Sequence, residues 1–397
     1  MRKALKIFVV ILALGLVVAG FYLYRVMPRI PARPFVKPSG PYAVGTMDFD
    51  WIDSSRGEPY TRRGDDKRHV PVQIWYPAVK GSGDTARYLL KPEQFSNRMG
   101  AFVARKARSN SVLDAAVAGD SAWPVLLYNH GGSWTRWSAT FATEWLASQG
   151  YVVVSVEHFG MNQSNKYGDG SPFTPDTLDY PPTTGNGVQD ARQTWAFLGD
   201  PVFKIWKADA RFALDQLEGL NRGPGPFQGK LDLTRVGAFG WSFGGALAVQ
   251  LSKDDPRVIA AVDHDGQLFD DVRQAGTTRP VMLIHHGIDD ALEYPEKDRA
   301  MVRELMHETE SWDSTARVAS TSDWYALTIA GIDHGNFSDL VLFMKNPEGR
   351  TDPRRAHEII NAYTLGFFDQ YLRGKPSDLL SATASPFSEA KLEAWKK

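Results

Sequence analysis

Ser242 stands at the centre of residues 240–244, Gly-Trp-Ser-Phe-Gly, which fit the pattern G-x-S-x-G. An apolar stretch at 236–239 comes directly before them, and a helix is predicted to begin near Gly245. A serine on a sharp turn between a strand and a helix is exposed and can act as a nucleophile, and flanking glycines relieve the crowding there. The segment predicts a nucleophile at Ser242. The alternative is a glycine-rich turn whose serine does no chemistry.

A serine nucleophile needs a neighbouring base, and the base needs a third group to orient it. When the serine lies on such a turn, the acid and then the histidine follow it in the chain. His334 follows a predicted strand at 325–329 and lies in a loop, where it could reach over the serine. His307 and His357 fall in predicted helices. We therefore predict that His334 is the base.

Two positions compete for the acid. Asp265 follows a predicted strand at 258–262, and Asp289 follows the next one at 281–284. The second position is the commoner one in this architecture, but either loop could reach the imidazole and spacing alone does not decide. A metal site at 285–290 is also conceivable. It is disfavoured because successive strand residues, here His285 and His286, point to opposite faces.

Backbone N–H groups are expected to stabilise the negative oxygen that forms during acyl transfer. His130-Gly131-Gly132 follows a predicted strand at 125–128, the loop that supplies one such N–H in this architecture. We predict an oxyanion hole made by the N–H groups of Gly132 and Phe243, with His130 as a scaffold residue. A plain turn is the alternative. Trp134 and Trp137, just beyond this loop, are candidates for lining a pocket.

The surrounding elements alternate between short apolar runs and amphipathic stretches. This alternation predicts an α/β protein with a mostly parallel sheet and helices on both faces. One large domain is expected over 42–397, with a loop insertion at about 160–190. Strands are predicted near 70–76, 125–128, 152–154, 236–239, 258–262, 281–284 and 325–329, and helices near 141–149, 208–217, 246–252, 296–308 and 356–372.

The N-terminal region carries a separate signal. Residues 7–24 contain no charged side chain and follow Arg2, Lys3 and Lys6. As a helix they would span about 27 Å, close to the roughly 30 Å hydrocarbon core of a bilayer. We expect an uncleaved signal-anchor at 1–27 and a proline-rich tether at 28–41, which place the catalytic domain on the periplasmic or extracellular side. Secretion after signal cleavage is the alternative.

Composition excludes several classes of protein. The chain has 397 residues, 43% hydrophobic and 23% charged, which is ordinary globular usage rather than that of a disordered or fibrous chain. Its net charge of −1 gives no basic field for nucleic acid. It has no cysteine, which excludes a thiol nucleophile and a disulfide. The oligomeric state is not indicated.

Taken together, these motifs resemble the platelet-activating factor acetylhydrolase family of α/β-hydrolases, and the likeness covers about residues 40–373. It is carried by His130-Gly131-Gly132, the stretch 141–158, Gly240-Trp241-Ser242-Phe243-Gly244-Gly245, Asp265-Gly266-Gln267-Leu268-Phe269 and, most specifically, His334-Gly335-Asn336-Phe337-Ser338-Asp339. The resemblance implies that Asp265 is the acid, with Asp289 as the alternative. The N-terminal anchor and the insertion depart from the family pattern and bear on the substrate.

The resemblance also implies a function. It implies an α/β-hydrolase fold and hydrolysis of short or oxidised acyl esters, including those of phospholipids, with no cofactor and no metal. One alternative is a general carboxylesterase or polyesterase without lipid preference. Another, from a different class, is a membrane-tethered binding protein that has kept the hydrolase fold without catalysis.

Overall fold

The computed structural model describes residues 34–81, 83–176, 180–381 and 385–397. The predicted anchor at 1–27 and the first part of the predicted tether lie outside these ranges. Among the residues that are described, no helix is both long enough and apolar enough to cross a bilayer. The division of the chain into anchor, tether and a single domain stays a prediction.

One sheet of 11 strands forms the centre of the described structure. Its six consecutive strands from β10 to β6 are all parallel, and the sheet continues beyond them through antiparallel pairs with β11 and β2. The predicted, mostly parallel sheet is confirmed. In order across the sheet the strands are β11 (Ala390–Trp395), β10 (Trp324–Ile329), β9 (Val281–His286), β8 (Val258–His264), β7 (Leu231–Trp241), β5 (Trp123–Asn129), β6 (Val152–Val156), β2 (Lys67–Ala78), β1 (Ala43–Gly57), β4 (Arg108–Leu113) and β3 (Thr85–Arg87).

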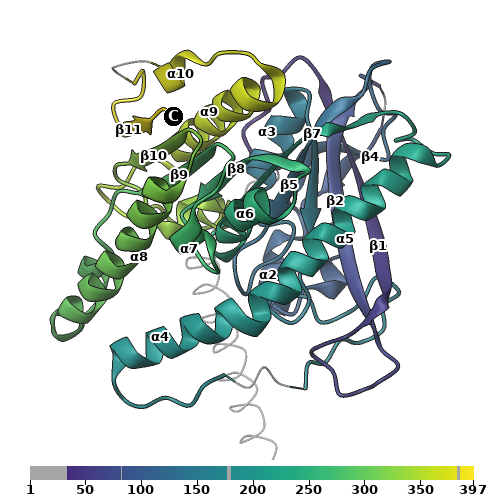
Figure 1. Ribbon diagram of the computed structural model, residues 1–397. Helices are drawn as coiled ribbons and strands as arrows, with labels where there is room; N and C mark the ends of the chain where they lie inside the picture. The colour runs from purple at the N-terminus through teal and green to yellow at the C-terminus, as the bar shows by residue number, and fades with distance from the viewer. Residues whose placement is uncertain (1–33, 82, 177–179, 382–384) are drawn as a thin grey trace, which may run out of the picture.

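Helices cover both faces of this sheet, as predicted. Figure 1 shows α5 and α6 in front of the sheet and α3 behind it. The helices are α2 (Arg98–Ala104), α3 (Thr140–Ser148), α4 (Gly187–Phe197), α5 (Phe203–Arg222), α6 (Phe243–Asp254), α7 (Val272–Ala275), α8 (Arg299–Ala319), α9 (Pro353–Arg373) and α10 (Asp378–Ser381). Short 3₁₀ or π turns are η1 (Pro92–Gln94), η2 (Leu198–Val202), η3 (Asp290–Glu293), η4 (Glu296–Asp298), η5 (His334–Phe337) and η6 (Asp339–Phe343).

The uninterrupted apolar runs form strands because both faces of the sheet are buried. In β5, Val125 and Leu127 join the core beneath α5 and α6, while Leu126 and Tyr128 join the core beneath α3 and α9. Side chains of a strand alternate between faces, so an apolar run of this kind supplies both cores at once.

The residues at the two ends of α9 explain where this helix begins and ends. At the start of α9, the Asp352 carboxylate accepts hydrogen bonds from two backbone N–H groups, and Pro353 occupies the first turn. At its end, Gly374 adopts φ 64°, a left-handed conformation that costs glycine little. These two signals explain where α9 begins and where it ends.

Several peripheral strands and helices were not predicted individually from the sequence, among them β1, β11 and α4. The strand β1 carries three aspartates at buried or half-buried positions, β11 is a short edge strand, and α4 has no fully buried side chain. None of them has the apolar pattern that marks the central elements. In its described residues, the predicted insertion is a loop up to residue 186, but its last residues begin α4 at Gly187 rather than continuing the loop.

Candidate functional site

Ser242 occupies a strained turn between β7 and α6. Its backbone adopts φ 57° and ψ −123°, which is rare for a residue with a side chain. Its own N–H donates to the carbonyl of His264 at 2.9 Å, and its carbonyl accepts from the N–H groups of Gly245 and Ala246. These bonds hold the serine at the carboxyl end of the sheet in the predicted conformation.

The glycines around Ser242 are required by close backbone contacts. A methyl group added at Gly244 would lie 2.1 Å from the carbonyl oxygen of Asn129 in β5, and one at Gly240 would lie 2.3 Å from the carbonyl oxygen of Gly244. The turn and the neighbouring strand therefore touch through bare backbone, and a side chain would push them apart.

We expect Gly244→Ala to lower the free energy of unfolding by about 1–3 kcal/mol, because a methyl group is forced against backbone that cannot move aside. Gly219→Ala is the matched control, since Gly219 lies in α5 with no atom within 4 Å of the added methyl. That change should stabilise the protein by roughly 0.5–1 kcal/mol. Urea unfolding of both variants measures the difference. Equal stability of the Gly244 variant and the unchanged chain would contradict this account.

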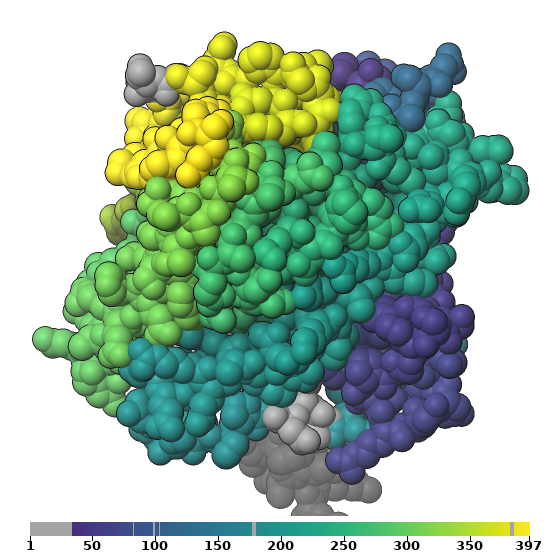
Figure 2. All heavy atoms as spheres, viewed as in Figure 1, coloured from purple at the N-terminus to yellow at the C-terminus, as the bar shows by residue number. Residues whose placement is uncertain are grey.

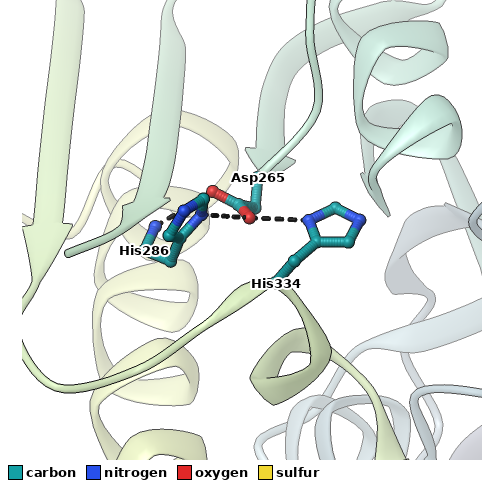
Figure 3. Close-up of side chains that lie close together, drawn as sticks. All are labelled: Asp265, His286 and His334. Atoms are coloured by element: carbon teal, nitrogen blue, oxygen red, sulfur yellow. Dashed lines mark hydrogen bonds and ion pairs between the residues drawn. The ribbon is translucent and has the colours of Figure 1, made fainter. Parts of the chain in front are cut away.

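The structure brings His334 and Asp265 together, although 69 residues separate them. The Asp265 carboxylate accepts a hydrogen bond from Nδ1 of His334 at 2.7 Å (Figure 3). Asp265 follows β8, and its N–H donates to the carbonyl of Ile284 in β9 at 2.8 Å, which fixes the loop. Burial alone would raise the pKa of Asp265, but hydrogen bonds from two histidines hold it far below its usual range. Asp265 is therefore an anion beside the imidazole.

Trp241, the residue before Ser242, contacts both the backbone and the ring of His334. Its indole N–H donates to the backbone carbonyl of His334 at 3.1 Å, and the two ring centroids lie 5.2 Å apart. Since Asp265 occupies Nδ1, the other ring nitrogen of His334 is left for Ser242. Among the described contacts, no hydrogen bond joins that nitrogen to the Ser242 hydroxyl. In free hydrolases this bond is often long and tightens only around substrate.

Gly132 and Phe243, the predicted oxyanion residues, lie against each other. A methyl group built on Gly132 would be 3.9 Å from Cβ of Phe243, and one on Gly131 would be 3.4 Å from Cβ of Ser242. Across the described ranges, the N–H groups of Gly132 and Phe243 donate to no other group. Two free N–H groups beside the serine are what an oxyanion hole requires.

His130 supports this loop from beneath. It is fully buried, its Nδ1 donates to the carbonyl of Gly131 at 2.7 Å, and its Nε2 accepts from the N–H of His158 at 3.1 Å. Burial lowers the pKa of His130 to about 4, so its ring is neutral at neutral pH. The prediction that His130 is a scaffold residue agrees with these contacts.

A buried network that sequence reasoning missed extends this support. The ring of His158 is held by Asp209 and Asn129, both at 3.1 Å, and it stacks on Trp206 at 4.0 Å between centroids. Trp206 in turn packs edge-on against Phe243 at 4.8 Å. Apart from the apolar periodicity of α5, nothing in the sequence signals that these residues meet.

Asp339 anchors the loop that carries His334. Its carboxylate accepts from the N–H groups of Thr140 and Phe141 at 2.7 and 3.0 Å, at the first turn of α3. His357 of α9 contributes by stacking on Phe141, with ring centroids 3.6 Å apart. The histidine loop is thus tied to an element almost 200 residues earlier in the chain.

Asp289, the alternative acid, lies elsewhere. Its carboxylate pairs with Arg303 at 2.9 Å and accepts from the N–H of Ala291 at 3.0 Å. His285 points toward Asp313, while His286 contacts Asp290 at 3.0 Å. The histidines and aspartates of 285–290 therefore do not converge on a common point, and the metal site considered there is not assembled.

A different set of side chains has suitable atoms for a metal ion. In the described part of the chain, Asp265, His286 and His334 place their ligand atoms within 4.8 Å of one another. One oxygen of Asp265, however, lies 2.7 Å from both imidazoles. Two ligands of one zinc ion would lie about 3.3 Å apart at ordinary bond lengths. The distances between these atoms are therefore those of hydrogen bonds and not those between ligands of one metal ion. The sequence did not single out His286 as a partner of the acid.

The two tryptophans predicted to line a pocket differ. Trp137 is fully buried beneath the guanidinium of Arg136, whereas Trp134 is half-buried and packs on Trp241 at 5.2 Å. Only Trp134 is close to the site. Figure 2 shows the atoms of α4 beside those of α8. A cavity of about 520 Å³ is lined by residues of these two helices together with η2, α7 and the loop at 269–271. Phe269, one of its walls, also contacts Phe243 at 5.1 Å.

Comparisons with known proteins find two matching families and several similar proteins. Residues 31–167 match the family Platelet-activating factor acetylhydrolase, isoform II, and residues 132–311 match the Dienelactone hydrolase family. A probable 1-alkyl-2-acetylglycerophosphocholine esterase from Arthroderma benhamiae is 25% identical over 67% of this chain, a match that spans 65% of the fungal protein. The platelet-activating factor acetylhydrolase of Canis lupus familiaris is 22% identical over 87% of this chain and 77% of its own.

A solved structure shares the fold. The chain is similar to a ferulic acid esterase from Streptomyces cinnamoneus with a TM-score of 0.69 and 24% identity, over 91% of this chain and 98% of the other. The fold, the elbow at Ser242 and both family matches lead to one assignment. The two family matches and the similar curated proteins support a platelet-activating factor acetylhydrolase-like member of the α/β-hydrolases, and they agree on ester hydrolysis.

Proposed function

We propose that the chain is a serine ester hydrolase in which Ser242, His334 and Asp265 act as one unit. The observation that carries the proposal is the 2.7 Å hydrogen bond from His334 to the buried Asp265, with His334 packed on the residue before Ser242. In this arrangement the acid fixes the imidazole so that its free nitrogen faces the serine.

Each step follows from these positions. The Ser242 oxygen attacks the ester carbonyl while His334 takes the hydroxyl proton, and the carbonyl oxygen, now negative, accepts hydrogen bonds from Gly132 and Phe243. The alcohol leaves with the proton from His334, and an acyl group remains on Ser242. Water then adds to the acyl carbon by the same sequence, releasing the carboxylic acid and restoring the serine.

We propose short or oxidised acyl esters, including those of phospholipids, as substrates. The support is the match of residues 31–167 to the acetylhydrolase family and the similarity to the fungal acetylglycerophosphocholine esterase and the canine acetylhydrolase. A general carboxylesterase or polyesterase is the second candidate. It is favoured by the Dienelactone hydrolase match, which spans Ser242 and Asp265.

An ester panel on the full chain separates the two candidates. With phosphatidylcholines that differ only in their sn-2 acyl group, we expect kcat/KM to fall at least tenfold between acetyl and palmitoyl. The physical reason is that a site shaped for a short acyl group gains nothing in the transition state from a long chain. Aryl acetates without a phospholipid headgroup are the control. If they are cleaved at higher kcat/KM than every phospholipid, the lipid preference is wrong.

We also propose that the chain is held at a membrane with its catalytic domain outside the cytoplasm. The support is the uncharged run at 7–24 between Lys6 and Arg25. Alkaline washing of isolated membranes should leave the chain in the pellet, with Met1 or Arg2 still present at its N-terminus. A wash-released chain beginning near residue 20 would instead indicate cleavage and secretion.

A further inference from the structure

His286 is a second histidine on the acid, and the proposed mechanism does not use it. Its Nδ1 donates to Asp265 at 2.7 Å, to the same oxygen that His334 contacts, and its backbone N–H donates to the other oxygen at 2.9 Å. Its Nε2 meets Asp290 at 3.0 Å. Figure 3 shows the carboxylate of Asp265 between the two rings.

Both nitrogens of His286 face carboxylate oxygens. A neutral imidazole has one N–H and could donate to only one of them, whereas the charged ring donates to both. The side chain is 13% exposed and that of Asp265 is 5% exposed, so water competes little for these bonds. With both carboxyl groups ionised, these contacts favour a charged imidazole at His286.

We propose that His286 is a positioning residue, a fixed cation between Asp265 and Asp290 that orients the acid toward His334 and disfavours protonation of His334 in the free enzyme. This role rests on the proposed serine esterase function, because it acts through Asp265 on the base. One ring nitrogen of His286 lies within 4.8 Å of one ring nitrogen of His334, close enough for positive charge on one ring to oppose positive charge on the other.

The groups around His286 are consistent with this role. Burial alone would lower the pKa of His286, but its hydrogen bonds to Asp265 and Asp290 raise it to about 10. Burial raises the pKa of Asp313 to about 8, so Asp313 is uncharged in acid solution. The titratable groups nearby are Asp263 on β8, Asp265 after it, His285 on β9, Asp290 in η3, Glu310 and Asp313 on α8, and His334 in η5.

The test is the pH profile of kcat/KM for His286→Gln. Glutamine keeps a donor for Asp265 but removes the positive charge, so the base accepts a proton more easily. We expect the acid limb of the profile to move to higher pH by about one unit. His286→Lys, which keeps a cation, should leave the limb closer to its original position. His307→Gln is the control, because that side chain is 88% exposed on α8.

A residue that only fills space would lower the rate equally at all pH values. An acid limb that stays in place in His286→Gln therefore overturns the proposal, whatever happens to the plateau. Circular dichroism and thermal unfolding establish that each variant is folded before its profile is compared.

NMR of the unchanged chain with nitrogen-labelled histidine tests the charge without any variant at His286. The ring should remain protonated on both nitrogens from about pH 6 to about pH 8, since its pKa lies near 10. Loss of that proton below about pH 7 overturns the inference even if Ser242 is the nucleophile. Failure of Ser242 to react would overturn the proposed function instead, while the NMR result would stand.

Discussion

Replacing Ser242 with alanine should reduce kcat by about 10⁴- to 10⁶-fold and abolish labelling by a fluorophosphonate probe. The substitution removes the oxygen that forms the acyl-enzyme, while the oxyanion N–H groups remain. Alanine must adopt the same strained φ of 57° as the serine. The turn should keep this conformation, because the hydrogen bonds that fix it are made by the backbone and not by the serine side chain. Initial rates on a short-chain ester and gel detection of the probe measure the two effects.

The same experiment separates catalysis from the alternative of a non-catalytic binding protein. Such a protein would hydrolyse esters no faster with Ser242 than without it. The control is Ser133→Ala, because Ser133 is an exposed serine close to the oxyanion loop and should not react with the probe. Retention of most esterase activity in Ser242→Ala would rule out Ser242 as the nucleophile.

Replacing Asp265 with asparagine should lower kcat by about 10⁴-fold without unfolding the protein. The amide would donate a hydrogen bond to Nδ1 of His334 where the carboxylate now accepts one. The imidazole would then carry its proton on the nitrogen that faces Ser242 and could not act as a base. The pH profile and the rate at saturating substrate measure the loss.

Asp289→Asn is the matched control for this change. Asp289 pairs with Arg303 at the surface, and exposed ion pairs contribute little to stability. The asparagine oxygen can still accept from the N–H of Ala291 at the start of η3. Activity close to that of the unchanged chain is expected. A collapse in Asp289→Asn alone would reverse the assignment of the acid.

The central strands were predictable because burial on both faces of the sheet produces an uninterrupted run of apolar residues. In β5 and β6 nearly every residue is apolar, and the elbow at Ser242 follows such a strand directly. The same reasoning could not find α4, which has no fully buried side chain, or β1, whose aspartates obscure its alternation. Neither element has the buried apolar run that marks the central strands.

The residues of the site also divide into those that local sequence context predicts and those that it does not. Ser242, His334 and the glycine loop were predictable from local context, because each follows a buried strand. The choice between Asp265 and Asp289 was not, since both follow strands and only the resemblance favoured Asp265. His286 and the network of His158, Asp209 and Trp206 depend on which distant loops meet, a matter of tertiary packing that local pattern does not encode.

The attachment of the His334 loop to α3 has a consequence for the order in which the site is completed during synthesis of the chain. The Asp339 carboxylate holds N–H groups 198 and 199 residues earlier in the chain. A nascent polypeptide that has emerged only as far as α6 already contains its reactive serine, but the loop that would activate it has not been synthesised. The proposed base is therefore absent until about five-sixths of the chain has been synthesised, so the site is completed only near the end of translation.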